Sequence, residues 1–437
     1  MPLANELSFQ YDVAEILITN QFFMNSPTNI LLLIPNLGLG GAQRVFHDHS
    51  VELAKHYTVT EAVFNAEGGD MYPSGNKVVS LEVAGGGSPI EKISNFARRI
   101  KRLRAFKSSL NTDLCVSHLE GADYVNLFSK GSEKVVLCIH GSKLHDGNIA
   151  GLVGWLRKKV LMPNLYNRAD KIVTVSRDIN QELIQSFGVK PEKLVTINNF
   201  FEVAQIEEKS REALTVAEQA IYAAAPVLVT SGRLTRQKNQ APLLDVFAAL
   251  LKQRPAKLMF VGDGELRDDL TRHARHLGLR VYEAWSEEVL TPDYDVYFVG
   301  LQQNPFKYIR PASLFVFPSA WEGFPMALGE AMICKVPVIT TDCPTGPREI
   351  LAPNILKPQQ PIRAAEKADF GMLMPMLNHN ATLAADQRVW TETLSQLLGD
   401  ATECARLGQL ASERMQDFTR EKIFCQWVTV LEEVLAR

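Results

Sequence analysis

The feature that most constrains the fold is a rhythm of strand, loop and helix that runs through the chain twice. Residues 30–34 (ILLLI) form an unbroken aliphatic run, followed by a glycine-rich turn and a helical pattern over residues 42–55. Aliphatic runs of this length are typical of parallel strands that are covered on both faces. The rhythm restarts at residues 227–230, after a stretch at 202–225 rich in Glu and Ala that we interpret as the link between two halves.

This alternation predicts an α/β protein with two Rossmann-like, doubly wound domains. Further strands are expected at 57–64, 79–83, 114–117, 134–139, 171–175, 258–261, 296–299, 314–317 and 336–340, and helices at 265–277, at 420–436 and from about residue 240. Open α/β sheets bind ligands at the carboxyl ends of their strands, so two such domains facing each other would enclose a ligand cleft. We predict an N-terminal extension at 1–23, an N-terminal domain at 24–205, a C-terminal domain at 222–415, and a helix at 416–437 that crosses back to the N-terminal domain.

Composition limits the class of protein further. The chain of 437 residues is long enough for two or three domains, and its net charge of −3 argues against nucleic-acid binding through bulk positive charge. Six scattered cysteines without a C-x-x-C pair indicate reduced thiols rather than a disulfide framework or a zinc site. No run approaches the roughly 18 apolar residues of a membrane span, and residues 1–23 lack the pattern of a signal peptide. Met24 stands just before the first strand, so residues 1–23 are a peripheral extension or an upstream mis-start.

The strongest motif is a pair of glutamates, Glu322 and Glu330, separated by seven residues. Pro325 suits the first turn of a helix, so Glu322 is expected in the preceding loop and Glu330 within that helix. Eight residues do not return to the same face of a helix, so the two carboxylates are predicted to have different tasks. The amides at the start of such a helix suit phosphate oxygens. Two unrelated, solvated surface glutamates are the alternative for this motif taken alone.

A second motif is the loop Ser231–Asn239 (SGRLTRQKN), which follows an expected strand. Arg233 and Lys238 place two positive charges at the carboxyl end of that strand, where a pair of phosphates fits. Two fixed cations can balance a diphosphate leaving group without a metal. A solvated basic loop is the alternative.

Two further features lie at expected strand ends in the first half. The turn 36–44 (NLGLGGAQR) contains Gly41, and glycines there allow close backbone approach to a ligand. A dinucleotide-binding fingerprint is the rival interpretation, but Gln43 stands where its third glycine is required. His140 follows the strand 134–139, although a lone histidine is more often structural.

Three other motifs favour structural roles. His47 and His49 lie two residues apart within an expected helix, so they point to different sides and do not share a metal. Asp293 and Asp295 resemble a metal clamp, but they lead into a strand and are interpreted as solvating its start. The sequence 262–264 (GDG) is first of all good turn chemistry.

Together these motifs resemble glycosyltransferase family 4, retaining transferases with the GT-B fold. The resemblance covers residues 29–350, with Gly40-Gly41, Gly232-Arg233, Lys238-Asn239, 261–264 and Glu322…Glu330 in the order of the family. The segments 304–309 (NPFKYI) and 342–349 (DCPTGPRE) are similar to the subset that builds bacterial surface polysaccharides, lipopolysaccharide or capsule, often from UDP-N-acetylhexosamines or UDP-galactose. The chain departs from the family at Ser313, where Asp is common, and over 353–369, which is longer and poorer in glycine.

The resemblance implies a role for each matching residue. Arg233 and Lys238 grip the donor diphosphate, Glu330 holds the ribose hydroxyls, Glu322 lies beside the sugar and phosphates, and His140 contacts the sugar. The implied catalytic residues are Glu322, Arg233, Lys238 and His140, and the implied donor-binding residues are Gly41, Gly232, Arg233, Lys238, Gly323, Phe324 and Glu330. Front-face chemistry, in which the leaving phosphate helps to deprotonate the acceptor, implies no enzyme nucleophile, no cofactor and no metal.

A basic amphipathic stretch points to a membrane-linked acceptor. Residues 91–110 carry seven Lys and Arg, with Ile93, Phe96, Ile100, Leu103 and Phe106 at helical spacing. Such a helix can lie on an anionic membrane, and residues 151–161, with Trp155 and Leu156, offer a second contact. A helix packed on the sheet with a solvated basic face is the alternative. We expect a cytoplasmic protein, either free or peripheral on the inner face of the membrane.

The sequence therefore predicts a retaining, metal-independent glycosyltransferase. It would move a hexose or N-acetylhexosamine from a nucleotide diphosphate sugar to a lipid-linked or polysaccharide acceptor. UDP is the expected nucleotide of the donor. The alternatives are a GDP-mannose-dependent mannosyltransferase, a non-catalytic relative that binds sugar nucleotides, a Rossmann oxidoreductase, and a membrane adaptor that uses the basic helix alone.

Overall fold

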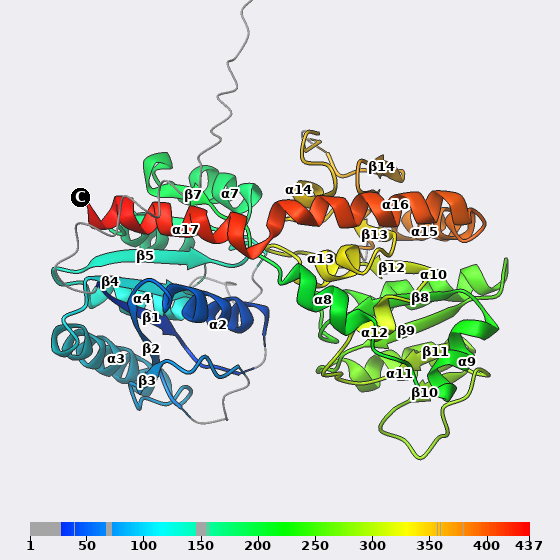
Figure 1. Ribbon diagram of the computed structural model, residues 1–437, viewed down its shortest axis with the longest axis horizontal. Helices are drawn as coiled ribbons and strands as arrows, with labels where there is room; N and C mark the ends of the chain where they lie inside the picture. The colour runs from blue at the N-terminus through cyan, green and yellow to red at the C-terminus, as the bar shows by residue number, and fades with distance from the viewer. Residues whose placement is uncertain are drawn as a thin grey trace, which may run out of the picture. The chain divides into compact units, whose positions relative to one another are not determined.

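The computed structural model describes residues 28–38, 40–66, 72–145, 154, 157–355, 357–358, 360–378 and 380–437. The predicted extension at 1–23, Met24, Trp155 and Leu156 lie outside this part of the chain. The chain divides into two compact units, one formed by Met1–Cys138, Arg168–Lys171 and Phe424–Arg437, the other by Ile139–Asn167 and Ile172–Ile423. Two α/β sheets, of seven and eight strands, organise the fold (Figure 1).

The first sheet has the strand order β3-β2-β1-β4-β5-β6-β7. Its strands are β1 (Asn29–Ile34), β2 (Thr58–Val63), β3 (Lys77–Ser80), β4 (Leu114–His118), β5 (Lys134–Ile139), β6 (Lys171–Thr174) and β7 (Leu194–Thr196). Its helical segments are α2 (Gly41–Leu53), α3 (Pro89–Ser109), α4 (Glu120–Phe128), η2 (Arg157–Leu161), α6 (Met162–Tyr166), α7 (Arg177–Phe187) and η3 (Pro191–Lys193). The chain first builds outward through β2 and β3, then returns to β4 on the other side of β1, so the strand order reverses between β1 and β4.

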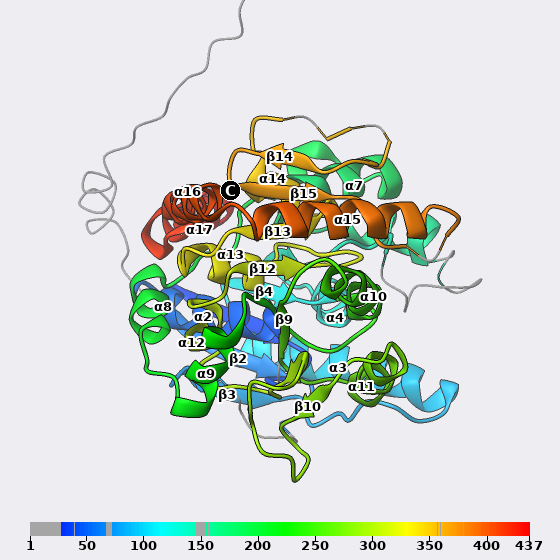
Figure 2. The same cartoon turned by 90° about the vertical axis from the view of Figure 1, so that its right-hand side faces the viewer.

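The second sheet repeats this plan with the order β10-β11-β9-β8-β12-β13-β15-β14 (Figure 2). Its strands are β8 (Val227–Ser231), β9 (Lys257–Val261), β10 (Val281–Glu283), β11 (Val296–Phe298), β12 (Leu314–Phe317), β13 (Val338–Thr341), β14 (Glu366–Ala368) and β15 (Gly371–Met374). β14 pairs antiparallel with β15, whereas the pairs from β10 to β15 are parallel. The strand order reverses between β8 and β12.

Helices follow most strands of this half. They are α8 (Val203–Ser210), α9 (Val216–Ala224), α10 (Gln240–Leu251), α11 (Arg267–His276), α12 (Phe306–Ile309), α13 (Met326–Ile333), α14 (Pro347–Leu351), α15 (Leu383–Leu397), α16 (Ala401–Arg414) and η4 (Met415–Phe418). The last helix, α17 (Arg420–Leu435), belongs mostly to the first unit, which includes Phe424–Arg437. In the core, the rings of Phe260 and Phe298 stack with centroids 4.6 Å apart, and the buried indole of Trp390 donates to the Pro375 carbonyl. Burial of these aromatic rings dominates the stability of the sheet.

Most predicted strands are confirmed, and the misses have local causes. The expected strand at 79–83 is observed at Lys77–Ser80. Beyond it Glu82 leaves the extended conformation with a φ of +47°, although the N–H groups of Leu81 and Val83 still donate to the carbonyls of Val63 and Phe64. The stretch 202–225, interpreted as a link, folds into α8 and α9, and Thr215 and Glu218 form a capping box at the start of α9. β7, β10, β14 and β15 are only three or four residues long and have no clear periodicity.

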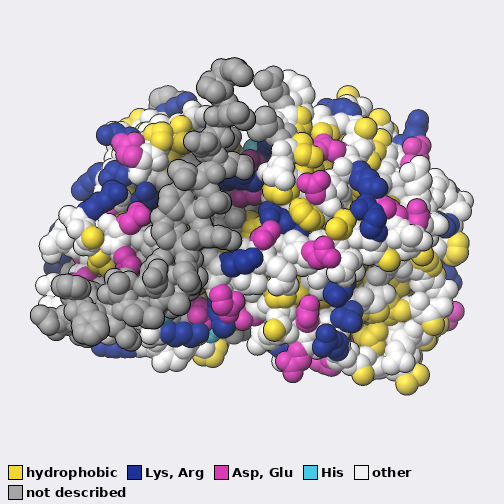
Figure 3. Space-filling view, turned by 45° about the horizontal axis from the view of Figure 1, so that its top comes forward, with side chains coloured by type: hydrophobic (Ala, Val, Ile, Leu, Met, Phe, Trp, Pro, Cys, Tyr) yellow, Lys and Arg dark blue, Asp and Glu magenta, His cyan; other side chains and the backbone are white. Residues whose placement is uncertain are grey.

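The apolar side chains of helix α3 pack mainly against the sheet, as in the structural alternative considered for this segment. Leu103 is fully buried, and Phe96, Ile100 and Phe106 pack against the core of the first sheet. Its basic side chains lie largely on the exposed face, and only Ile90 and Ile93 remain as large exposed apolar side chains. No helix among the described residues is long and apolar enough to span a bilayer. On the face shown in Figure 3, acidic and basic side chains are interspersed.

Candidate active site

The two strongest sequence motifs lie at one end of the second sheet. The motif loop 232–239 follows β8, and the loop that carries Glu322 follows β12. β8 and β12 are parallel neighbours at the point where the strand order reverses. In open α/β sheets this switch point is the usual place for a ligand, because the two following loops diverge there and leave space between them.

Lys238 and Glu322 form the centre of this site. Lys238 Nζ donates to Glu322 Oε1 across 2.7 Å, and the two side chains are 17% and 6% exposed. The ammonium group also lies 4.7 Å from the centroid of the Phe317 ring. The backbone strengthens the link, because the Ala320 N–H donates to the Gln237 carbonyl and Gln237 Nε2 donates to the Trp321 carbonyl. A cation and a carboxylate 84 residues apart in sequence are therefore held as a pair.

Arg233 contrasts with Lys238. Its side chain is exposed, and within the described part of the chain no hydrogen bond or ion pair of the guanidinium group is found. Gly232 precedes it with a φ of +139°, and a Cβ there would lie 3.4 Å from Lys238 Cε. The second cation of the motif is therefore available to an anionic ligand, and it can bind phosphate oxygens with a bidentate fork.

The turn at residues 262–264, interpreted from the sequence first of all as turn chemistry, supports this cationic loop. The Gly232 N–H donates to the Val261 carbonyl and the Leu234 N–H donates to the Asp263 carbonyl, both at 3.0 Å. A Cβ on Gly262 would collide with the Gly232 carbonyl oxygen, and a Cβ on Gly264 would lie 2.5 Å from the Leu234 carbonyl oxygen. The two glycines thus let the loops after β8 and β9 approach each other closely.

The helix that follows Glu322 begins as the proline predicts. Pro325 is the N-cap of α13, and Glu330 is buried one turn inside the helix. Phe324 is buried, with its ring edge-on to Phe418 at a centroid distance of 5.2 Å. The predicted placement of Glu322 in the loop and of Glu330 in the following helix is confirmed, and both residues are buried.

His140 follows β5, as predicted, and is partly exposed. Burial, and secondarily the charge of Lys143, lower the pKa of His140 to about 3, so its imidazole is neutral near pH 7. A Cβ on Gly323 would collide with the His140 carbonyl oxygen, and both residues belong to the second compact unit. Gly41 is the first residue of α2, and a Cβ there would meet nothing within 4 Å.

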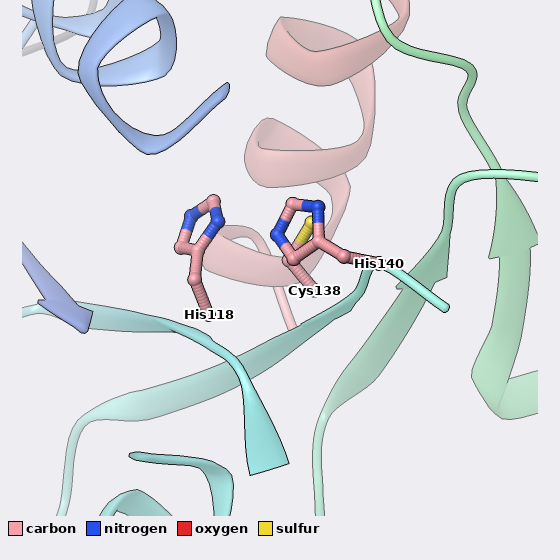
Figure 4. A group of neighbouring side chains, drawn as sticks. All are labelled: His118, Cys138 and His140. Carbon is pink, nitrogen blue, oxygen red and sulfur yellow. The ribbon is translucent and has the colours of Figure 1, made fainter. Parts of the chain in front are cut away.

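A cluster that the sequence did not suggest lies at the ends of β4 and β5 (Figure 4). His118 is paired in register with Cys138, and His140 follows two residues later. One potential ligand atom from each side chain lies within 4.8 Å of the others. Donor atoms bound to one zinc ion would be roughly 3.3–3.8 Å apart, which lies within this limit. The His118 ring is packed edge-on against Phe46 at 5.2 Å.

The other metal-like motifs have structural partners. His47 Nδ1 lies 3.2 Å from the Tyr72 carbonyl oxygen, whereas the buried His49 packs on Trp427 at 4.5 Å, so the two rings face different neighbours. Asp295 forms a bidentate pair with Arg280, with distances of 2.7 and 3.1 Å. The sequence predicts that Asp295 only solvates the start of β11. In the structure it forms a salt bridge with Arg280.

Two doubly wound sheets with a cation–carboxylate pair at the switch point of the second define a class of α/β proteins that bind ligands at the carboxyl ends of their strands. Comparison with known proteins makes this specific. Residues 39–205 match the family described as Glycosyltransferase Family 4, and residues 225–369 match the family described as Glycosyl transferases group 1. The chain belongs to the family 4-like glycosyltransferases.

Individual relatives agree with this assignment. One relative is the N-acetylgalactosamine-N,N'-diacetylbacillosaminyl-diphospho-undecaprenol 4-alpha-N-acetylgalactosaminyltransferase of Campylobacter jejuni. The two chains are 29% identical over 226 residues, and the match covers 52% of this chain and 52% of that protein. It is 26% identical over 405 residues to the amylovoran biosynthesis glycosyltransferase AmsD of Erwinia amylovora, which covers 92% of this chain and 99% of that protein. The chain thus spans about half the length of the Campylobacter protein.

The fold is likewise shared. The structure of Anabaena HepE in complex with UDP and glucose superposes with a TM-score of 0.70 at 18% identity, covering 93% of this chain and 100% of that one. The architecture is the GT-B fold, which confirms the fold class expected from the sequence.

Proposed function

We propose that the protein is a retaining, metal-independent glycosyltransferase of bacterial polysaccharide biosynthesis. It transfers a hexose or N-acetylhexosamine from a UDP-sugar to a lipid-linked or polysaccharide acceptor. The observation that carries this proposal is the placement of Lys238, paired with Glu322, and the exposed Arg233 at the switch point of the second sheet. A cation pair at this position suits a diphosphate.

The relatives support the choice of substrates. The Campylobacter protein is named for an acceptor that is a saccharide linked to undecaprenol through a diphosphate, and the Erwinia protein for amylovoran biosynthesis. HepE carries UDP and glucose in its structure. We therefore propose a UDP-sugar rather than GDP-mannose as the donor, and a lipid-linked saccharide as the preferred acceptor.

The proposed reaction is a front-face transfer, which the charges at the site support. The bond between the anomeric carbon of the donor and its phosphate oxygen breaks, and a bond to the acceptor hydroxyl oxygen forms on the same face of the sugar. The acceptor proton passes to an oxygen of the leaving diphosphate. Arg233 and Lys238 stabilise the negative charge that grows on that diphosphate, which is electrostatic stabilisation of the transition state. With two cations at the diphosphate, the proposed reaction needs no metal ion.

Other residues bind and orient the donor in this proposal. Glu330 accepts hydrogen bonds from the ribose hydroxyls, and Glu322 orients Lys238 beside the donor phosphates. The neutral imidazole of His140 contacts a sugar hydroxyl without adding charge. The backbone amide of Gly41 can approach a phosphate or sugar, since a Cβ at this residue would meet open space. The amides at the start of α13, next to Gly323 and Phe324, face the same ligand oxygens.

We also propose peripheral attachment to the anionic inner face of the membrane. The apolar stripe of α3 packs against the core from Phe96 onward, so the contact would use the exposed basic side chains of this helix with Ile90 and Ile93 at its first turns. Flotation with vesicles containing anionic lipid tests this, with Ile93→Asp and Lys101→Glu as variants. Binding that is equal with and without anionic lipid, or unaffected by both variants, would contradict the attachment.

The enzymatic proposal is tested with a panel of UDP-, GDP- and ADP-sugars. We expect stabilisation by UDP in a thermal-shift assay, slow donor hydrolysis with one UDP-sugar, and a product with the anomeric configuration of the donor by NMR. A response to GDP-mannose alone would establish the mannosyltransferase alternative. Nucleotide binding without turnover on any donor would establish a non-catalytic relative, and stabilisation by NAD alone would support an oxidoreductase.

A further inference from the structure

A buried arginine clamps the loop between β13 and α14. Arg348 donates to Asp342 through Nε and Nη2, both at 2.9 Å, and to Glu366 through Nη1 and Nη2, both at 2.8 Å. Asp342 directly follows β13 and Glu366 begins β14. The guanidinium group of Arg348, at the start of α14, therefore binds two segments through bidentate pairs: the end of β13 at Asp342 and the β14–β15 hairpin at Glu366.

The ion pairs of this clamp, formed by Arg348, Asp342 and Glu366, are largely shielded from solvent. The side chains of Arg348 and Asp342 are only 5% and 4% exposed, and that of Glu366 is 31% exposed. Burial acts to lower the pKa of Arg348, but the hydrogen bonds to Glu366 and Asp342 outweigh it and raise the pKa. The clamp therefore stays charged, and loss of Arg348 would leave the buried Asp342 carboxylate without a compensating charge.

The clamped loop holds the main chain of the candidate site. Thr345 Oγ1 donates to the carbonyl oxygens of Glu322 at 2.8 Å and of Gly323 at 3.2 Å. In the opposite direction, the Glu322 N–H donates to the Pro344 carbonyl at 2.8 Å. Gly346 lies directly against this segment, since a Cβ there would be 2.7 Å from the Gly323 carbonyl oxygen. Both main-chain polar groups of Glu322 are thus fixed by this one loop.

We propose that Thr345 and Arg348 are positioning residues of the transfer reaction: Arg348 fixes the loop, and Thr345 fixes the backbone of Glu322 and Gly323. The Glu322 carboxylate then points at Lys238, 2.7 Å away, and the ammonium group is held where the donor diphosphate binds. Neither Thr345 nor Arg348 touches the substrate. The role rests on the proposed function of the site, because it acts through Glu322 and Lys238.

The test uses substitutions that keep the shape of the side chain. Thr345→Val removes the hydroxyl donor at constant volume, and we expect kcat to fall about tenfold to a hundredfold, as misplacement of a catalytic group does. Thr345→Ser keeps the donor and is expected to restore activity to within about threefold of wild type. Thr391→Val is the matched control, since Thr391 is also buried and donates to a carbonyl at 2.9 Å, in α15 away from the site. Its kcat should equal that of wild type.

A double-mutant cycle separates positioning from simple destabilisation. If Thr345 acts through Glu322, Thr345→Val should lower kcat further by less than about twofold in the background of Glu322→Gln. Arg348→Lys, which keeps the charge but loses the bidentate fork, should lower kcat more than it raises KM for the donor. Full multiplicative effects in the cycle, or wild-type kcat in both Thr345→Val and Arg348→Lys, would overturn the positioning role. A wild-type protein without turnover on any donor would instead refute the proposed function, and the positioning role with it.

Discussion

Lys238 Nζ lies 2.7 Å from Glu322 Oε1, and the two residues come from loops after neighbouring parallel strands. The glutamate side chain is almost completely buried, whereas the lysine side chain is 17% exposed. Such a pair holds the cation in place. The two cations of this loop therefore differ in environment. Lys238 is paired with a carboxylate, whereas Arg233 is exposed.

This inequality predicts different results for the two alanine substitutions. Arg233→Ala should change the free energy of unfolding by less than about 0.5 kcal/mol, while transfer falls by at least about a hundredfold. Lys238→Ala should abolish transfer and also cost about 1–3 kcal/mol, between the costs of breaking an exposed and a buried ion pair. Urea unfolding and single-turnover assays measure both quantities. Undiminished turnover in both variants would defeat the assignment of the diphosphate site.

The close approach of the loops after β8 and β9 predicts a severe effect of Gly262→Ala. The new Cβ would collide with the Gly232 carbonyl oxygen, and the residue has a φ of +147°. We expect a cost of about 2–4 kcal/mol and a loss of UDP binding, because the cationic loop must shift. Gly278→Ala is the control: its φ is +78°, but its Cβ would meet open space, so it should cost about 1 kcal/mol and leave UDP binding intact. Calorimetric titration with UDP distinguishes the two, and equal affinity in both variants would contradict the prediction.

The lowered pKa of His140 predicts a specific dependence of stability on pH. The unfolded chain binds a proton at this residue below about pH 6.5, whereas the folded protein does so only near pH 3. The unfolded state therefore binds more protons in this window, and stability falls as the pH is lowered from 6.5 towards 3. His140→Asn should weaken this decline by up to about 1.4 kcal/mol per pH unit. Parallel curves for wild type and variant in unfolding experiments at pH 4.5–7 would show that His140 titrates normally.

The reaction is predicted to need no metal. Turnover should be unchanged by EDTA, and metal analysis of the purified protein should find less than about 0.1 metal ion per chain. The three side chains His118, Cys138 and His140 make this test specific, because they are the group that could hold an ion in the described part of the chain. One equivalent of zinc that is lost in Cys138→Ser would contradict the prediction and reveal a metal centre in the first sheet.

The sequence by itself determined the elements that have a strong local signal. The aliphatic run of β1, the helix start at Gln240 and the proline before α13 were each predictable, because buried parallel strands and helix N-termini have local rules. The order of the motifs along the chain was enough to indicate the family, and with it the GT-B fold. Strands of three residues, such as β7 and β10, were not predictable, because their pairing partners stabilise them rather than their own composition.

Only the tertiary structure decided which residues meet. The sequence could not show that Lys238 pairs with Glu322, that Gly262 makes room for Gly232, or that Thr345 holds the backbone of Glu322. It also left α3 undecided between a membrane surface and the core, and burial of Leu103 and its neighbours settled where the apolar stripe packs. The reason is the same in each case: periodicity and capping act within a few residues, whereas charge pairing and close packing act across loops that the sheet brings together.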